Sequence, residues 1–328
     1  MNWNALYDRL RAEAPGLELR RDEPMSRHTT FRVGGPAALM ALPKTVGEAK
    51  AVLKAAHDLK AELFFLGNGS NLLVSDRGTD RFVMKLSGRL ERGDVREVNQ
   101  QLVDWGGGSL SKLAVAALDR GLSGLEFAQG IPGSVGGGVY MNAGAYGGEI
   151  SKIVSSVTAL EPDGTVRELT NEECGFGYRK SIFSQSRLLV LQVCFAMEQR
   201  DRAEIKAQMD DLAARRREKQ PLEYPSAGST FKRPAPVDGQ PVYAAALIDG
   251  CGLKGMSVGG AQVSEKHAGF VVNRGGATCG DIMKLMAQVR ERVFQETGVT
   301  LARRAHIPPL VVYLCAPCKQ GEYVTSAF

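Results

Sequence analysis

The residues best suited to chemistry form a run of glycines and small side chains between positions 130 and 147. Ordered glycine costs backbone entropy, so seven glycines in these eighteen residues indicate positive φ angles or a very close neighbour. Uncovered backbone N–H groups can converge on an anion, and a helix that follows adds its positive end. Ile131, Val135 and Val139 within the run are not typical of a flexible linker. We therefore expect a cradle for a phosphate-bearing cofactor.

A second glycine segment, Gly67-Asn68-Gly69-Ser70-Asn71, follows an apolar run at residues 63–66 that predicts a strand. A tight glycine turn and another strand, residues 82–86, are expected next. The dinucleotide-binding fold differs, because its GxGxxG motif must open a helix. The sequence also lacks GxxxxGK[ST], which excludes a P-loop. The two glycine segments hold no acidic residue and together indicate a pyrophosphate-bearing cofactor bound by backbone amides.

The composition is that of a globular protein with two or three domains. The chain has 328 residues, 44% of them hydrophobic, and a formal charge of +5 from 41 basic and 36 acidic residues. The densest basic run, Arg215-Arg216-Arg217 with Lys219, is interpreted as a solvated helix end. Aromatic residues do not interleave these charges, so nucleic-acid binding is not expected.

Targeting signals and cysteines point to a cytoplasmic protein. No window approaches the roughly 18 apolar residues of a membrane span, and the first residues form an amphipathic pattern rather than a signal peptide. The six cysteines are expected to be free thiols. Cys315 and Cys318 have metal or redox spacing but lack a second pair, so no metal site is predicted.

Periodicity and capping signals place the helices and strands. Helices are predicted from Thr45 to about Lys60, from Ser109 to Arg120, from Asp201 to Lys219, and from Thr278 to a stop at Gly298. Residues 154–197 have the alternation of β-strands around a Pro-Asp-Gly turn. The pattern predicts an α+β protein with two cofactor subdomains and a C-terminal substrate domain.

Six motifs in the same order resemble the UDP-N-acetylenolpyruvoylglucosamine reductase family. The motifs are residues 29–37 (TTFRVGGPA), 66–72 (LGNGSNL), 130–137 with 141–147, Tyr178-Arg179, 225–232 (PSAGSTFK) and 247–255 (LIDGCGLKG). The resemblance covers about residues 20–300. It implies an FAD-binding fold of the vanillyl-alcohol-oxidase (PCMH) type and a C-terminal α+β substrate-binding domain. The expected parts are FAD-binding subdomains at 1–86 and 87–200, the substrate-binding domain at 201–307 and an atypical tail at 308–328.

The resemblance also implies a reaction. NADPH reduces FAD and leaves, and UDP-N-acetylenolpyruvoylglucosamine then takes its place, receives hydride at C3 and is protonated at C2. The product is UDP-N-acetylmuramate, a precursor of peptidoglycan. Arg179 matches the residue that holds the substrate carboxylate and stabilises the enolate. Ser229 matches the proton donor.

Further roles follow from the same resemblance. Residues implied to contact FAD are Gly67, Asn68, Gly69, Ser70, Asn71, Gly133, Ser134, Gly136, Gly137, Asn142, Gly144 and Ala145. Tyr146 is implied at the sugar-nucleotide end, Lys219 at the diphosphate, and His267 at another polar contact of the substrate. The segment between Tyr178 and Leu188 is short and lacks the tyrosine-bearing insertion of one subtype, which implies an open cleft. A monomer is expected.

The chain departs from the family after the last helix. Ala302 and Arg304 stand where relatives have two glutamates, the second of them catalytic, and residues 308–328 no longer resemble the family. Either the sequence has diverged and another acid substitutes, or the reading frame has slipped after about Leu301. The abruptness of the break favours a slip. An active or weakened reductase and a flavin-binding pseudoenzyme are therefore both open.

Overall fold

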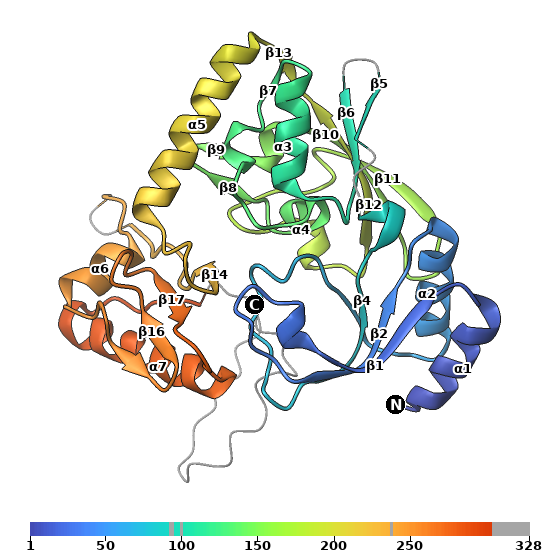
Figure 1. Ribbon diagram of the computed structural model, residues 1–328, viewed down its shortest axis with the longest axis horizontal. Coiled ribbons are helices and arrows are strands. Elements are labelled where there is room, and N and C mark those ends of the chain that lie inside the picture. The colour runs from blue at the N-terminus through green and yellow to red at the C-terminus, as the bar shows by residue number, and fades with distance from the viewer. Residues whose placement is uncertain (92–94, 99–100, 237–238, 304–328) are drawn as a thin grey trace.

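Three larger β-sheets with their own helices follow one another along the chain in the computed structural model (Figure 1), and two-stranded sheets β7-β13 and β8-β9 accompany them. The structure describes residues 1–91, 95–98, 101–236 and 239–303. Among these residues no helix is both long and apolar enough to span a bilayer. The predicted α+β class is confirmed.

The first sheet has the strand order β1-β2-β4-β3 and is covered by two helices. Its elements are α1 (Trp3–Glu13), β1 (Glu18–Pro24), η1 (Met25–Arg27), β2 (Pro36–Leu42), α2 (Val46–Asp58), β3 (Leu63–Phe65) and β4 (Thr79–Met84). A capping box of Thr45 and Glu48 opens α2, as expected. The expectation of a tight turn between β3 and β4 is wrong. These strands pair in parallel, which requires a long crossing connection, here residues 66–78.

The second sheet is antiparallel, in the order β11-β10-β12-β6-β5. Its strands are β5 (Arg96–Val98), β6 (Gln101–Trp105), β10 (Val154–Leu160), β11 (Val166–Thr170) and β12 (Leu189–Ala196). Around it lie η2 (Gly88–Leu90), α3 (Leu110–Asp119), β7 (Leu122–Ser123), η3 (Glu126–Ala128), α4 (Val135–Tyr140), β8 (Gly144–Ala145), β9 (Gly148–Glu149), η4 (Ile150–Lys152), η5 (Ile182–Ser184) and β13 (Glu198–Gln199). The α4 helix lies inside the long glycine run rather than after it.

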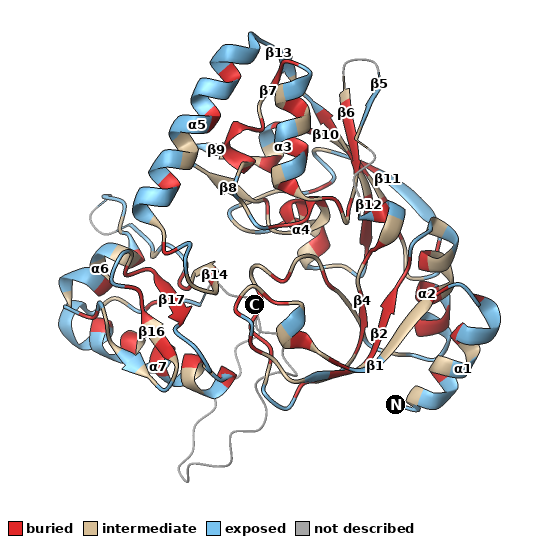
Figure 2. Cartoon of the chain, in the orientation of Figure 1, coloured by how far each residue is buried: buried red, intermediate tan, exposed pale blue. Residues whose placement is uncertain are grey.

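The third sheet has the order β14-β17-β16-β15. Its elements are α5 (Arg202–Lys219), β14 (Ser226–Ser229), α6 (Ala244–Gly250), β15 (Ser257–Val258), β16 (Ala261–Val263), β17 (Phe270–Asn273) and α7 (Cys279–Thr297). The α5 helix runs along one edge of the molecule from β13 toward this sheet (Figure 1). Figure 2 shows that most of its surface is exposed, and its buried residues are Ile205, Met209 and Arg216.

The three sheets share parts of their cores. Leu160, Leu189 and Leu191 of the second sheet pack into the core between the first sheet and its helices. Phe31, Val33 and Leu73 pack instead with the third core, under α7. The predicted domain boundaries fall between sheets and remain predictions, since the packing crosses them.

Hydrogen bonds tie the third sheet to the first part of the chain. Thr30 Oγ1 donates to the Ser226 carbonyl at 2.6 Å, and Asn273 Nδ2 donates to the Phe31 carbonyl at 3.0 Å. The Asp76 carboxylate accepts the Cys279 and Gly280 N–H groups at the start of α7, at 2.8 and 3.1 Å. These ties fix β14, which carries Ser229, relative to the first glycine segment.

Candidate functional site

The two glycine segments lie side by side. Asn68 Nδ2 donates to the Pro132 carbonyl at 3.2 Å. A Cβ atom on Gly67 would stand 2.4 Å from Ser134 Oγ, closer than any real contact, so only glycine permits this approach. A Cβ on Gly133 would lie 3.8 Å from Ser70 Oγ. The tertiary structure therefore joins into one loop pair two segments that residues 72–129 separate in sequence.

Some glycines of the long run permit close packing within the protein. The Gly136 N–H donates to the Gly106 carbonyl at 2.7 Å, and a Cβ on Gly136 would crowd that oxygen at 2.9 Å. A Cβ on Gly138 would lie 2.9 Å from Leu110 Cδ1. Glycine thus lets α4, which Ser134 caps, approach the neighbouring backbone closely.

Other backbone groups of the loop pair are free to bind a ligand. The N–H groups of residues 67–70 and 133–134 make no hydrogen bond to any residue within the described ranges. Neither segment contains an acidic side chain. Unpaired backbone donors on two adjacent loops that contain no acidic residue suit a phosphate. The loop pair therefore fits the diphosphate of a flavin nucleotide.

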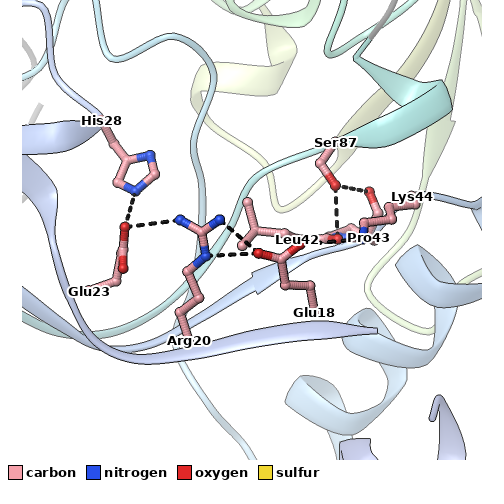
Figure 3. Close-up of polar contacts among 8 residues, drawn as sticks. All are labelled: Glu18, Arg20, Glu23, His28, Leu42, Pro43, Lys44 and Ser87. Carbon is pink, nitrogen blue, oxygen red and sulfur yellow. Dashed lines mark hydrogen bonds and ion pairs between the residues drawn. The ribbon is translucent and has the colours of Figure 1, made fainter. Parts of the chain in front are cut away.

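A chain of ion pairs runs from Glu18 through Arg20 and Glu23 to His28 (Figure 3), and the His28 backbone lies against the first glycine segment. Arg20 bridges Glu18 at 2.7 Å and Glu23 at 3.1 Å, and His28 Nε2 lies 2.8 Å from the same Glu23 oxygen. Burial would raise the pKa of Glu23, but hydrogen bonds from His28 and Arg20 outweigh it and lower that pKa. A Cβ on Gly69, whose φ is +62°, would stand 2.0 Å from the His28 carbonyl oxygen. The segment therefore rests on a fixed backbone.

Arg179 is held with a defined orientation. Its φ of +58° lies in the left-handed region, which is rare for a side chain of this size. Nη1 donates to the Asn142 carbonyl at 3.0 Å and Nη2 to the Gly144 carbonyl at 2.6 Å. Its buried Nε has no partner among the residues that the structure describes. Burial lowers the pKa of this guanidinium, although an arginine stays charged at neutral pH.

Asn142 fixes the turn that carries Arg179. This asparagine is buried, with φ +40°, and its Nδ2 donates to the Gly177 carbonyl at 3.1 Å. Its Oδ1 accepts the Ser151 N–H at 2.9 Å. The side chain is thus engaged within the protein. A cofactor contact from its backbone stays a prediction, as do the contacts of Gly144 and Ala145 in the short β8–β9 pair.

Ser229 lies at the end of β14, where the pairing with β17 is irregular. Gly228 before it has φ +74°, and Ser229 stands opposite Phe270. Its hydroxyl makes no hydrogen bond within the described part of the chain. Farther along the same segment, Arg233 Cζ lies 5.9 Å from the Tyr178 ring. The segment after Ser229 and the turn of Arg179 therefore converge.

The three predicted substrate contacts fall into two groups. Tyr146, 42% exposed with φ +51°, lies 5.7 Å from Arg216 Cζ, and the exposed Lys219 ends the helix that carries Arg216. His267 belongs to the Ser229 group. Its ring packs edge-on against Phe270 at 4.9 Å, and its Nδ1 accepts the Gly269 N–H at 3.1 Å. Burial lowers the pKa of His267.

The interpretation of the basic run as a solvated helix end is wrong for Arg216. This side chain is 6% exposed, and its Nε is buried without a partner in the described residues. A sequence signal existed, because the buried positions Ile205 and Met209 continue along the same helical face to residue 216. An inward cation after an apolar stripe indicates a functional position.

The chain returns to Ser229's neighbourhood after α7. The Lys232 N–H donates to the Ala302 carbonyl at 2.7 Å, and Phe231 pairs with Arg303. Arg304, Cys315 and Cys318 lie outside the described residues.

The four described cysteines are free thiols, and burial raises the pKa of Cys174 to about 11 and of Cys279 to about 12. Within the described ranges no group of three His, Cys, Asp or Glu could hold a metal.

Comparison with known proteins agrees with this geometry. A family model for the C-terminal domain of UDP-N-acetylenolpyruvoylglucosamine reductase matches residues 220–307, and a model for an FAD binding domain matches residues 37–170. A Clostridium botulinum UDP-N-acetylenolpyruvoylglucosamine reductase is 46% identical over 286 residues, which are 87% of this chain and 91% of that protein. The chain belongs to the UDP-N-acetylenolpyruvoylglucosamine reductase family.

Other members of the reductase family are similar over nearly their whole length. The Limosilactobacillus reuteri reductase is 44% identical over 90% of this chain and 96% of its own. The crystal structure of the Thermus caldophilus reductase superposes with a TM-score of 0.74 at 35% identity, covering 89% of this chain and 99% of that one. The expected FAD-binding PCMH-type fold and the FAD-dependent oxidoreductase class are confirmed. The C-terminal match extends past Leu301, to residue 307.

Proposed function

We propose that this chain reduces UDP-N-acetylenolpyruvoylglucosamine to UDP-N-acetylmuramate, with FAD as cofactor and NADPH as reductant. The observation that carries the proposal is Arg179, whose guanidinium is anchored by two carbonyls while its buried Nε lacks a partner in the described chain. The turn of Arg179 converges with the segment that follows Ser229. Relatives that are 41–46% identical to this chain are named UDP-N-acetylenolpyruvoylglucosamine reductase.

FAD, when bound, would take hydride from NADPH and supply it to C3 of the enolpyruvyl group. The loop pair would hold its diphosphate with the N–H groups of residues 67–70 and 133–134. Arg179 would hold the substrate carboxylate and stabilise the charge that develops on it after hydride transfer. Because its Nη atoms are fixed, the guanidinium needs little reorganisation as that charge appears.

Ser229 would donate the proton to C2. A hydroxyl is a weak acid, but the enolate carbon is a strong base, so a positioned donor is sufficient. The conformation of Gly228 supports this role, because its positive φ turns the strand just before Ser229. The Ser229 hydroxyl is not engaged with any described residue, which leaves it available to a ligand.

Stopped-flow absorbance of the flavin tests the proposal. NADPH should bleach the yellow holoprotein, and UDP-N-acetylenolpyruvoylglucosamine should then restore its colour rapidly. Ser229→Ala should slow the second step by about 10²- to 10⁴-fold and spare the first. Equal loss of both steps would refute Ser229 as the proton donor, and a wild-type protein that the substrate does not reoxidise would refute the activity.

A second candidate is a flavin-binding pseudoenzyme, favoured by Ala302 and Arg304 at the places of the expected glutamates. Such a protein would bleach with NADPH but would not reoxidise with substrate. Losing one transition-state partner commonly costs about 10²- to 10³-fold in rate. Arg304→Glu should therefore raise the reoxidation rate of an impaired enzyme, whereas a wild type that already reoxidises rapidly would mean that another acid substitutes.

The origin of the divergent end can be tested separately. The slipped frame, the cytoplasmic location and the monomeric state are still predictions. Resequencing the coding DNA, together with the mass of the expressed protein, decides between divergence and a slip. An uninterrupted frame that yields the expected mass would reject the slip.

A further inference from the structure

Arg216 occupies a position where a folded protein rarely keeps a charge. It follows the buried residues Ile205 and Met209 on the inner face of α5 and is itself 6% exposed. Its side chain lies on Gly130, where a Cβ would stand 3.3 Å from Arg216 Cδ and 3.4 Å from Nη1. Gly130, with φ +78°, thus makes room for this arginine at the beginning of the long glycine run.

No counter-charge accompanies this cation in the described structure. Among the described residues no carboxylate lies within ion-pair distance of Arg216, and its buried Nε has no hydrogen-bond partner. Burial lowers the pKa of the guanidinium, and the neighbouring Tyr146 hydroxyl only partly opposes that effect. An uncompensated buried charge destabilises a protein, so a position of this kind favours a ligand that supplies the missing charge.

The surroundings of Arg216 define the kind of ligand. Tyr146 is exposed beside it, and Lys219, three residues later on the helix, has no ion pair among the described residues. A planar guanidinium, an ammonium and a phenol hydroxyl are all hydrogen-bond donors. Such a set suits an anion with several oxygen atoms, and arginine binds phosphate oxygens in pairs.

We propose that Arg216 is a binding residue for a nucleotide diphosphate, which it contacts beside Tyr146 at the end of the long glycine run. This rests on the proposed function, in which the loop pair would hold the diphosphate of FAD and two exchanging ligands carry another diphosphate: the UDP-sugar and NADPH. The substrate carboxylate is a different group, which Arg179 would hold. Arg216 therefore acts on binding and not on the chemical step.

The variant Arg216→Met tests the proposal, with Arg215→Met as its control. Arg215 lies next to Arg216 on the same helix but is exposed and pairs with Asp211 at 2.9 Å. Calorimetry on the oxidised holoprotein measures the affinities of UDP, uridine and NADP⁺. We expect Arg216→Met to weaken the affinity for UDP by about 10- to 100-fold, because it removes charged hydrogen bonds. The affinity for uridine should stay unchanged. Arg215→Met should change neither.

Thermal unfolding without added nucleotide separates binding from structure. A purely structural arginine would lower the melting temperature when replaced. A ligand-binding cation without a counter-charge should leave the melting temperature unchanged or raise it when methionine replaces it. Arg216→Met with a lower melting temperature and unaltered UDP affinity would overturn the proposal.

The remaining outcomes are also decisive. If Arg216→Met weakens the binding of UDP alone, Arg216 contacts the diphosphate of the UDP-sugar. If it weakens the binding of NADP⁺ alone, Arg216 contacts the diphosphate of the reductant. If UDP and NADP⁺ bind the wild type no better than uridine at millimolar concentrations, the proposal is wrong. Substrate-dependent reoxidation of the wild type is measured independently, so a failed proposed function and a failed role for Arg216 can be told apart.

Discussion

The buried Arg216 and the partly buried Arg179 lie in regions of opposite construction. Arg179 sits in a turn that is crosslinked from several sides, with two Nη hydrogen bonds to carbonyls and a buried asparagine holding the next loop. Arg216 projects from a regular helix, lies against Gly130 and has the Tyr146 ring 5.7 Å from its Cζ. Each has a buried Nε without a described partner. Two backbone carbonyls thus orient Arg179, whereas Arg216 is buried and has the Tyr146 hydroxyl as a hydrogen-bonding neighbour.

This difference separates two tasks. A group that stabilises developing charge must be in place before the charge appears, which requires fixed neighbours. A group that captures a charged ligand can depend on the ligand for its partner, because the attraction is strong where water is excluded. We therefore expect losses in the region of Arg179 to affect the chemical step, and losses in the region of Arg216 to affect binding.

The largest expected effect is that of Arg179→Met. It should slow substrate-dependent reoxidation by about 10²- to 10³-fold, because a preorganised donor to the developing charge is lost. Stopped-flow absorbance measures the rate. Arg233→Met is the control, since Arg233 is a neighbouring but exposed cation, and it should change the rate much less. Similar reoxidation rates in the Arg179 and Arg233 variants would mean that the anchored position of Arg179 gives it no special role in the chemical step.

Asn142→Ala tests whether the crosslinks around Arg179 matter. It strips the Gly177 carbonyl and the Ser151 N–H of their partners and should cost about 2–3 kcal/mol of unfolding free energy. Misplacement of the arginine should also slow reoxidation by about tenfold or more.

The matched control for Asn142 is Asn171→Ala. Asn171 donates to the Ser151 and Val154 carbonyls at 2.8 and 2.7 Å, and no bond to the Arg179 turn is involved. Denaturant unfolding should show a comparable loss of stability, while the folded variant keeps its reoxidation rate. If Asn171→Ala also slowed reoxidation, the reoxidation rate would reflect a general loss of order in the loops and not the position of Arg179.

A smaller effect is expected at Tyr146, on the binding side of the comparison. Tyr146→Phe removes the hydroxyl beside Arg216 and should weaken the affinity for UDP by about fivefold, which corresponds to the loss of one hydrogen bond. Calorimetry measures the affinity, and the reoxidation rate at saturating substrate should stay unchanged. A fall in that saturated rate would place Tyr146 with the chemical step instead.

The smallest effect concerns the ion-pair chain under the first glycine segment. The pKa of Glu23 is lowered in the folded state, so its contribution is present above the ordinary carboxyl pKa of 4.5 and is lost as pH falls through the lowered value. Glu23→Gln should therefore lower the unfolding free energy by about 1–2 kcal/mol at neutral pH. Unfolding curves of variant and wild type should converge in acid. A difference that persists at low pH would assign the effect to packing.

Much of the fold could be predicted because its signals are local. The capping residues Thr45 and Thr278, and Gly298 with its positive φ, mark helix ends through contacts within a few residues. The parallel pairing of β3 and β4 could not be predicted in this way, because it depends on how the intervening loop crosses the sheet. The burial of Arg216 likewise differs from the prediction, because charge alone favours an exposed position.

The sequence by itself determined the family and the two glycine segments, and it predicted roles for Arg179 and Ser229, because these depend on residue types in a fixed order. The tertiary structure decided what each residue faces. It joined Gly67 to Ser134, anchored Arg179 on the carbonyls of the long glycine run, and turned Arg216 inward against Gly130. The physical reason is that partners, burial and missing counter-charges arise between segments far apart in the chain, where no local pattern records them.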